Sequence, residues 1–283
     1  MDPIITQVMN TIQGEGVNIG KPMTFIRLGN CNLQCPFCDS KWSNNIDIEY
    51  IKKHQIEIDG LKFPEIMNLY NSGNYFDYIK NKNQKYKHLL ITGGEPFLNQ
   101  EFIIDLIKYV NPDIVEFETN GIIFPDKILK FIEIPIVINI SPKFDINCYD
   151  DFIYIPKDPL ADILSSLLNH FIINQTKYTD YINVNIFWKF IHASDNGEKI
   201  IRFIDNLKIN NKTIYIMPLT PHNIYNSRNF KKFEVNCKET LKFCMENNFK
   251  YTPRLQNFLF KTNTSKFSFT HNEYDVIEKK VDL

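Results

Sequence analysis

The sequence predicts an α/β fold, a partial (β/α)6-type barrel built mostly from parallel strands. Apolar runs bounded by turn residues alternate along the chain with segments of helical spacing. Most of these runs are continuously apolar, which is typical of parallel strands covered on both faces. Short polar motifs follow the ends of several runs, and the chemistry of an α/β barrel gathers at the carboxyl ends of its strands.

The elements follow from these patterns in chain order. The expected strands are residues 23–29, 88–94, 113–121, 135–143, 182–192, 212–218 and a final candidate at 249–255. The expected helices are residues 100–110, 125–131, 159–172, 196–208 and 231–247, and each could form a crossover between parallel strands.

The 283 residues are interpreted as a single domain with an insertion at about 43–87 and a C-terminal extension at about 260–283. Lys and Arg number 32 against 33 Asp and Glu, so overall charge recommends neither nucleic acid nor an anionic membrane as a partner. The sequence contains neither an apolar stretch of membrane-spanning length nor a leader pattern, so we expect a cytoplasmic protein that acts on a small molecule.

Three of the six cysteines lie within eight residues, in the pattern CxxxCxxC formed by Cys31, Cys35 and Cys38. Three thiolates on one loop can hold a [4Fe-4S] cluster and leave its fourth iron open. Zinc is the alternative, but the sequence has no second CxxC or paired histidines to complete a structural site. Cys148, Cys237 and Cys244 lack metal-ligand spacing, and Cys237 and Cys244, seven residues apart on one face of an expected helix, are interpreted as core residues.

A set of motifs in fixed order carries a resemblance to a known family. They are "TIQGEG", "FIRLGNCNLQCPFCDS", "TGGEP", "ETNG" and "SPK". The loop with "CPFC" resembles that of the radical S-adenosylmethionine (SAM) enzymes, whose core is a partial or full α/β barrel. The whole set resembles the 7-carboxy-7-deazaguanine synthase family within them, from about residue 4 to 259 apart from the insertion.

The resemblance implies that SAM chelates the open iron and that one electron, from a donor such as flavodoxin, breaks its sulfonium bond to give a 5'-deoxyadenosyl radical. No side chain then acts as the catalyst itself. Phe37 is expected to pack on adenine, Glu95 to accept from the methionine ammonium, and two glycines to let the backbone approach it. The full set of implied cofactor contacts is Phe37, Thr92, Gly93, Gly94, Glu95, Ser141 and Lys143.

The implied substrate is 6-carboxytetrahydropterin, which has a carboxylate at one end and a donor edge at the other. Arg27 offers a planar fork that suits the carboxylate, and Glu15 can accept from the donor edge. Gln13 and Thr92 complete the expected substrate contacts. Ser40 is expected to contribute an oxygen to Mg²⁺, which would orient the pterin, whereas Asp39 could instead cap the following turn.

The chain also departs from the family pattern. Gln256 stands where family members often have histidine, and the tail beyond residue 260 puts a substrate role of the terminal carboxylate in doubt. Two alternatives remain open from the sequence. One is another radical SAM enzyme, such as an activase of glycyl-radical enzymes, and the other is a noncatalytic iron-sulfur module. A homodimer is expected, and the fate of the product is not readable from the sequence.

Overall fold

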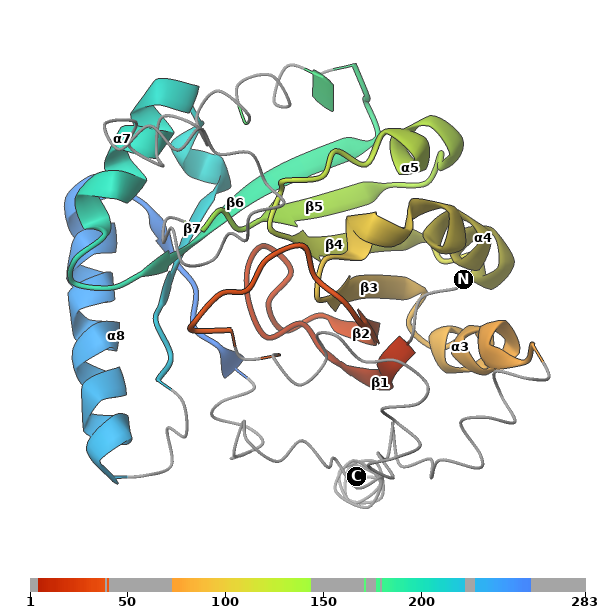
Figure 1. The fold of residues 1–283 in the computed structure, drawn as a ribbon, viewed down its shortest axis with the longest axis horizontal. Coiled ribbons are helices and arrows are strands. Elements are labelled where there is room, and N and C mark those ends of the chain that lie inside the picture. Colours follow the sequence, from red (N-terminus) through yellow and green to blue (C-terminus); the bar gives the residue numbers. More distant parts are fainter. Residues whose placement is uncertain are drawn as a thin grey trace.

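The fold is an open eight-stranded sheet with helices packed outside it (Figure 1). A computed structural model describes residues 5–38, 40, 73–143, 171, 177–178, 180–221 and 227–255. The strand order follows the sequence from β1 to β8, and only β1 runs antiparallel to its neighbour. The predicted incomplete α/β barrel of mostly parallel strands is therefore confirmed.

The strands are β1 (Ile5–Ile12), β2 (Pro22–Leu28), β3 (His88–Gly93), β4 (Ile114–Thr119), β5 (Ile136–Ile140), β6 (Val184–His192), β7 (Ile214–Pro218) and β8 (Lys250–Tyr251). The helices are α3 (Tyr75–Asn83), α4 (Gln100–Val110), α5 (Asp126–Phe131), α7 (Gly197–Leu207) and α8 (Ser227–Asn247), with short 3₁₀ turns η2 (Pro96–Asn99) and η4 (Asn211–Thr213).

The outer face of the sheet, which the helices cover, carries the hydrophobic core. On β4, Val115 and Phe117 are completely buried on this face, and the Phe117 ring lies 5.1 Å from that of Phe97 in η2. The covering helices are amphipathic, and α7 buries Ile200 and Phe203 while its opposite side faces solvent. Because side chains alternate along a strand, the intervening residues of β4 point to the inner face.

One strand and one helix were not predicted. Strand β1 mixes polar and apolar residues, and it pairs antiparallel with β2 at the edge of the sheet. Helix α3 lies within the stretch interpreted as an insertion, yet its Tyr75 and Ile79 are buried in the main core. The last strand is shorter than the predicted 249–255.

Several predicted features fall on residues that the structure does not describe. These are most of the helix at 159–172, the first part of the insertion, the C-terminal extension, Asp39, Cys148 and Gln256. None of the helices in the described part of the chain has the length and apolar composition needed to cross a lipid bilayer.

Candidate active site

The motifs singled out from the sequence meet at the carboxyl-terminal edge of the sheet, because β2 to β5 are parallel neighbours. Backbone hydrogen bonds join them directly. Gly94 N donates to Leu28 O at 3.0 Å and Glu95 N donates to Asn30 O at 2.9 Å, which ties "TGGEP" to the start of the cysteine loop. Ser141 N donates to Thr119 O at 2.8 Å, which ties "SPK" to "ETNG".

The three cysteines form a small cluster with Leu33 and Phe37, and none of the three forms a disulfide in the described part of the chain. Burial, together with the negative charge of Glu95 and the two neighbouring cysteines, raises the pKa of Cys31 to about 12, although the hydrogen bond from Leu33 N opposes the rise.

Within the described ranges, no three His, Cys, Asp or Glu side chains converge as the ligands of one metal ion do. A zinc ion requires that convergence. A [4Fe-4S] cluster does not, because each thiolate binds a different iron. Three thiols on one loop are a donor set that fits a [4Fe-4S] cluster.

Gly93 and Gly94 are required first by packing within the protein. A Cβ atom on Gly93 would lie 2.0 Å from Leu28 O, and one on Gly94 would lie 1.7 Å from Asn30 O. Gly93 also has a φ of 142°, which side chains other than hydrogen rarely adopt. The two glycines thus let the end of β3 press against the cysteine loop, and close approach to SAM remains a prediction.

Glu95 is completely buried and holds three parts of the edge together. Its carboxylate accepts from Phe97 N at 3.1 Å, from Thr119 Oγ1 at 2.8 Å and from Asn120 N at 2.9 Å. Burial raises its pKa to about 7, although these hydrogen bonds and the charge of Lys143 oppose the shift. A contact with the methionine ammonium would use the lone pairs that these three donors leave.

Three further residues were predicted to contact SAM or Mg²⁺, namely Ser141, Lys143 and Ser40. Lys143 Nζ donates to Ser141 Oγ at 2.8 Å, so the two "SPK" side chains contact each other. The buried Ser40 hydroxyl donates to Gly93 O at 3.4 Å and lies 3.5 Å from Cys38 Sγ. Ser40 therefore sits between the cysteine loop and the end of β3.

Arg27 and Thr92 are register partners on β2 and β3, so both side chains lie on the inner face. Arg27 Nε donates to Gln7 Oε1 at 3.3 Å, and the guanidinium lies 4.9 Å from the centroid of the Phe25 ring. These contacts hold the guanidinium toward Gln7 of β1 and the Phe25 ring.

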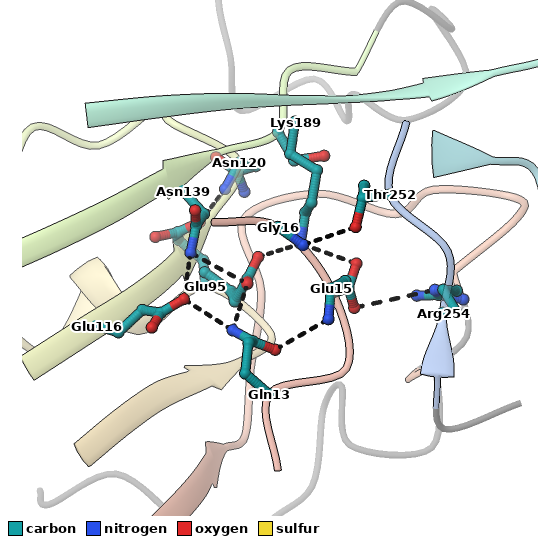
Figure 2. Close-up of polar contacts among 12 residues, drawn as sticks. Gln13, Glu15, Gly16, Glu95, Glu116, Asn120, Asn139, Lys189, Thr252 and Arg254 are labelled. Carbon is teal, nitrogen blue, oxygen red and sulfur yellow. Dashed lines mark hydrogen bonds and ion pairs between the residues drawn. The ribbon is translucent and has the colours of Figure 1, made fainter. Parts of the chain in front are cut away.

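A buried polar network occupies the inner face of the central strands (Figure 2). Glu116 accepts from Gln13, Asn18 and Asn139, each at 2.7 Å, and lies 2.9 Å from His88 Nε2. Burial alone would raise the pKa of Glu116, but the hydrogen bonds from His88, Asn18 and Gln13 lower it below its usual range. Glu116 is therefore ionised, and it anchors the loop that contains Gln13.

A second charged cluster lies beside the first (Figure 2). Lys189 Nζ of β6 donates to Glu15 Oε2 at 3.0 Å and also pairs with Glu118, and Arg254 Nε lies 3.9 Å from Glu15 Oε1. Burial raises the pKa of Glu118 despite the attraction of Lys189, and repulsion from Glu15 adds to the rise. The pKa of Lys189 is raised, because the two carboxylates outweigh the effect of its burial.

The "QGEG" loop is held from the C-terminal side as well. Gly16 N donates to Thr252 Oγ1 at 2.8 Å, and Leu255 N donates to Gly14 O at 2.9 Å. Together with the bond from Gln13 to Glu116, these contacts fix the loop across the inner face of the sheet.

The Radical SAM superfamily model matches residues 25–227, which is more than half of the chain. The chain belongs to the radical SAM superfamily. Membership implies a [4Fe-4S] cluster and SAM, as the cysteine spacing and the resemblance predicted. The protein is therefore a radical SAM enzyme and not a noncatalytic iron-sulfur module.

Among relatives, the 7-carboxy-7-deazaguanine synthase of Clostridium acetobutylicum is 28% identical over 218 residues, which cover 73% of this chain and 89% of the relative. The enzyme of the same name from Methanocaldococcus jannaschii is 27% identical over 261 residues, covering 84% and 93%. Among solved structures, QueE from Escherichia coli aligns with a TM-score of 0.46 at 18% identity, covering 89% of this chain and 93% of that one.

The polar network on the inner face was not predicted from the sequence of this radical SAM chain. Its members Glu116, Glu118, Asn139 and Lys189 are polar residues within strands that otherwise read as apolar. Their alternation was visible in "DIVEFETNG" and "PIVINISPK" and indicated a polar inner face. The partners of each residue were not visible, because they come from distant parts of the chain.

Proposed function

We propose that this radical SAM enzyme is a 7-carboxy-7-deazaguanine synthase, which converts 6-carboxy-5,6,7,8-tetrahydropterin to 7-carboxy-7-deazaguanine and ammonia in 7-deazapurine (queuosine-type) biosynthesis. The observation that carries the proposal is the pair of relatives with this name, which align over about nine-tenths of their own length. The inner face of the sheet supports the proposal. It presents the cation Arg27 on β2 and the acceptor Glu15, which Lys189 of β6 contacts.

Cys31, Cys35 and Cys38 would hold the [4Fe-4S] cluster, and SAM would bind beside it. When bound, these groups supply the radical that starts the reaction. The chain positions the cofactor through Phe37 of the cysteine loop, through the edge formed by "TGGEP", and through Ser141 and Lys143. The hydrogen bond between these last two side chains brings the lysine charge to the same edge.

At the substrate, the Arg27 fork would bind the carboxylate, and Thr92 lies beside it in register. Glu15 would accept from the donor edge of the pterin. Lys189 Nζ lies 3.0 Å from Glu15 Oε2 and Arg254 Nε lies 3.9 Å from Glu15 Oε1. Nearby cations favour the charged form of a carboxyl group, which is the form that accepts hydrogen bonds. Gln13 would orient Glu15, because Gln13 Oε1 accepts from Glu15 N at 3.4 Å.

The proposal includes Mg²⁺ near Ser40, whose hydroxyl oxygen is an acceptable ligand for that cation. It also includes a cytoplasmic homodimer and a one-electron donor such as flavodoxin. The carboxypterin, once held, would lie on the polar inner face, away from the helices that cover the outer face.

The deciding experiment is an anaerobic assay of the reconstituted protein with reductant, SAM, Mg²⁺ and the carboxypterin. We expect 7-carboxy-7-deazaguanine and ammonia in equal amounts. Changing Cys31, Cys35 or Cys38 to Ala should abolish both the cluster absorption and SAM cleavage, whereas Cys237→Ala and Cys244→Ala should leave both unchanged. SAM cleavage with no affinity for the pterin would instead favour an activase.

A further inference from the structure

The "ETNG" motif at the end of β4 has no role in the proposed function, yet each of its last three residues makes a defined contact. Thr119 Oγ1 accepts from Gly121 N at 3.0 Å and donates to Glu95. Gly121 has a φ of 79°, and a Cβ atom there would lie 2.5 Å from Ile140 and 2.6 Å from Phe171. The turn after β4 is therefore fixed by its own sequence.

Asn120 uses both ends of its side-chain amide. Its Oδ1 accepts from Ile122 N at 2.9 Å, within the same turn. Its Nδ2 donates to Asn32 Oδ1 at 2.8 Å, and Asn32 lies in the cysteine loop directly after Cys31. The first bond sets which end of the amide faces the loop, so a donor is presented to Asn32.

Asn32 is also close to a thiol that the cluster would use. Its Oδ1 accepts from Asn120 and lies 3.8 Å from Cys31 Sγ, while Leu33 N donates to that sulfur at 3.4 Å. The turn after β4 is also tied to Glu95, because Asn120 N donates to Glu95 Oε2. Glu95 N in turn donates to Asn30 O, which precedes Cys31 in the sequence. Bonds from "TGGEP" and "ETNG" therefore hold the loop on both sides of the first cysteine.

We propose that Asn120 is a positioning residue that fixes the cysteine loop through Asn32 and so slows loss of the cluster. Hydrogen bonds from residues around the metal ligands orient those ligands in this way. The inference depends on membership of the radical SAM superfamily and not on the identity of the substrate. It remains testable whether or not the pterin is turned over.

The test measures the rate at which reconstituted protein releases iron to a chelator under anaerobic conditions. Asn120→Ala and Asn32→Leu should each speed release by about five- to tenfold, the effect expected from losing one buried hydrogen bond. The double variant should release iron no faster than either single variant, because both changes remove the same bond.

Asn183→Ala is the matched control. Asn183 donates to Ile132 O at 3.2 Å and to Ile134 O at 3.0 Å, at the opposite end of the strands. Its loss should lower the melting temperature of the protein and leave iron release unchanged. If Asn120→Ala does not fold, Asn32→Leu alone is compared with this control. The proposal is overturned if the factors of the single variants multiply in the double variant, or if Asn32→Leu releases iron at the wild-type rate.

Discussion

The two faces of the sheet are built from alternate residues of the same strands, yet different interactions stabilise them. On β4, Val115 and Phe117 are buried against helices, while Glu116 and Glu118 face inward and pair with charged and amide groups. Apolar burial is non-directional and depends on volume and area. A buried carboxylate instead needs particular partners in particular places. We therefore expect changes on the outer face to affect the free energy of unfolding most, and changes on the inner face to affect ligand binding most.

The largest effect is expected on the outer face. Phe117→Ala should lower the free energy of unfolding by about 3–5 kcal/mol, because it leaves a cavity against Phe97. Glu118→Gln, one residue away on the inner face, should cost less than about 1.5 kcal/mol, since it removes one of the carboxylates crowded around a single lysine. Chemical denaturation of both variants measures the difference, and the reverse order would contradict the comparison.

The second-largest effect is the pH dependence of stability that Glu95 causes at the carboxyl-terminal edge of the sheet. Because its folded pKa of about 7 exceeds its usual 4.5, the folded state holds this proton more tightly than the unfolded chain does. Its contribution to stability is complete below pH 4.5 and is lost as the pH rises through about 7, a change of about 3 kcal/mol.

This dependence can be measured on the cluster-free protein by denaturation between pH 4.5 and 8. Glu95→Gln should flatten the fall in stability over that interval. Glu101→Gln removes an exposed carboxylate and should keep the wild-type slope. Equal slopes for wild type and Glu95→Gln would show that Glu95 is ionised throughout.

The third effect sharpens the comparison on the inner face, where changes should affect binding more than folding. Arg27→Ala should weaken carboxypterin binding about ten- to a hundredfold, because a charge-assisted hydrogen bond is worth roughly 1.5–3 kcal/mol. Arg27→Lys should recover only part of the lost affinity, since a point charge cannot form the bidentate fork. Glu15→Gln should weaken binding similarly, because the amide turns a donor toward the donor edge.

Titration calorimetry measures these affinities, and the iron content of each variant serves as the control. Product formed per SAM cleaved should fall in the same variants. Equal affinity in the wild type and all three variants would remove Arg27 and Glu15 from the substrate site.

The smallest effect is expected from Ser40→Ala. It should raise the Mg²⁺ concentration needed for half-maximal activity by a few-fold and leave the cluster intact, because one neutral ligand of an octahedron is lost. Ser40→Thr keeps the hydroxyl and should titrate like the wild type. An unchanged Mg²⁺ requirement in Ser40→Ala would argue against a metal at this position.

Much of the architecture could be predicted because it depends on neighbours in sequence. The core runs of β2 to β7 were recognisable because apolar residues recur along each strand where it faces the helices. Strand β1 was not, because an edge strand with one antiparallel neighbour tolerates polar residues. Helix α3 was not, because its short amphipathic pattern is weak beside the long polar stretch before it.

The sequence by itself determined the cysteine loop, because Cys31, Cys35 and Cys38 are close in the chain and their spacing already limits what they can hold. It also determined that the motifs lie at one edge, since parallel strands present their carboxyl ends together. Only the tertiary structure decided which charges meet on the inner face. Lys189 and Glu15 are 174 residues apart and Gln13 and Glu116 are 103 apart, so their pairing depends on strand order and register.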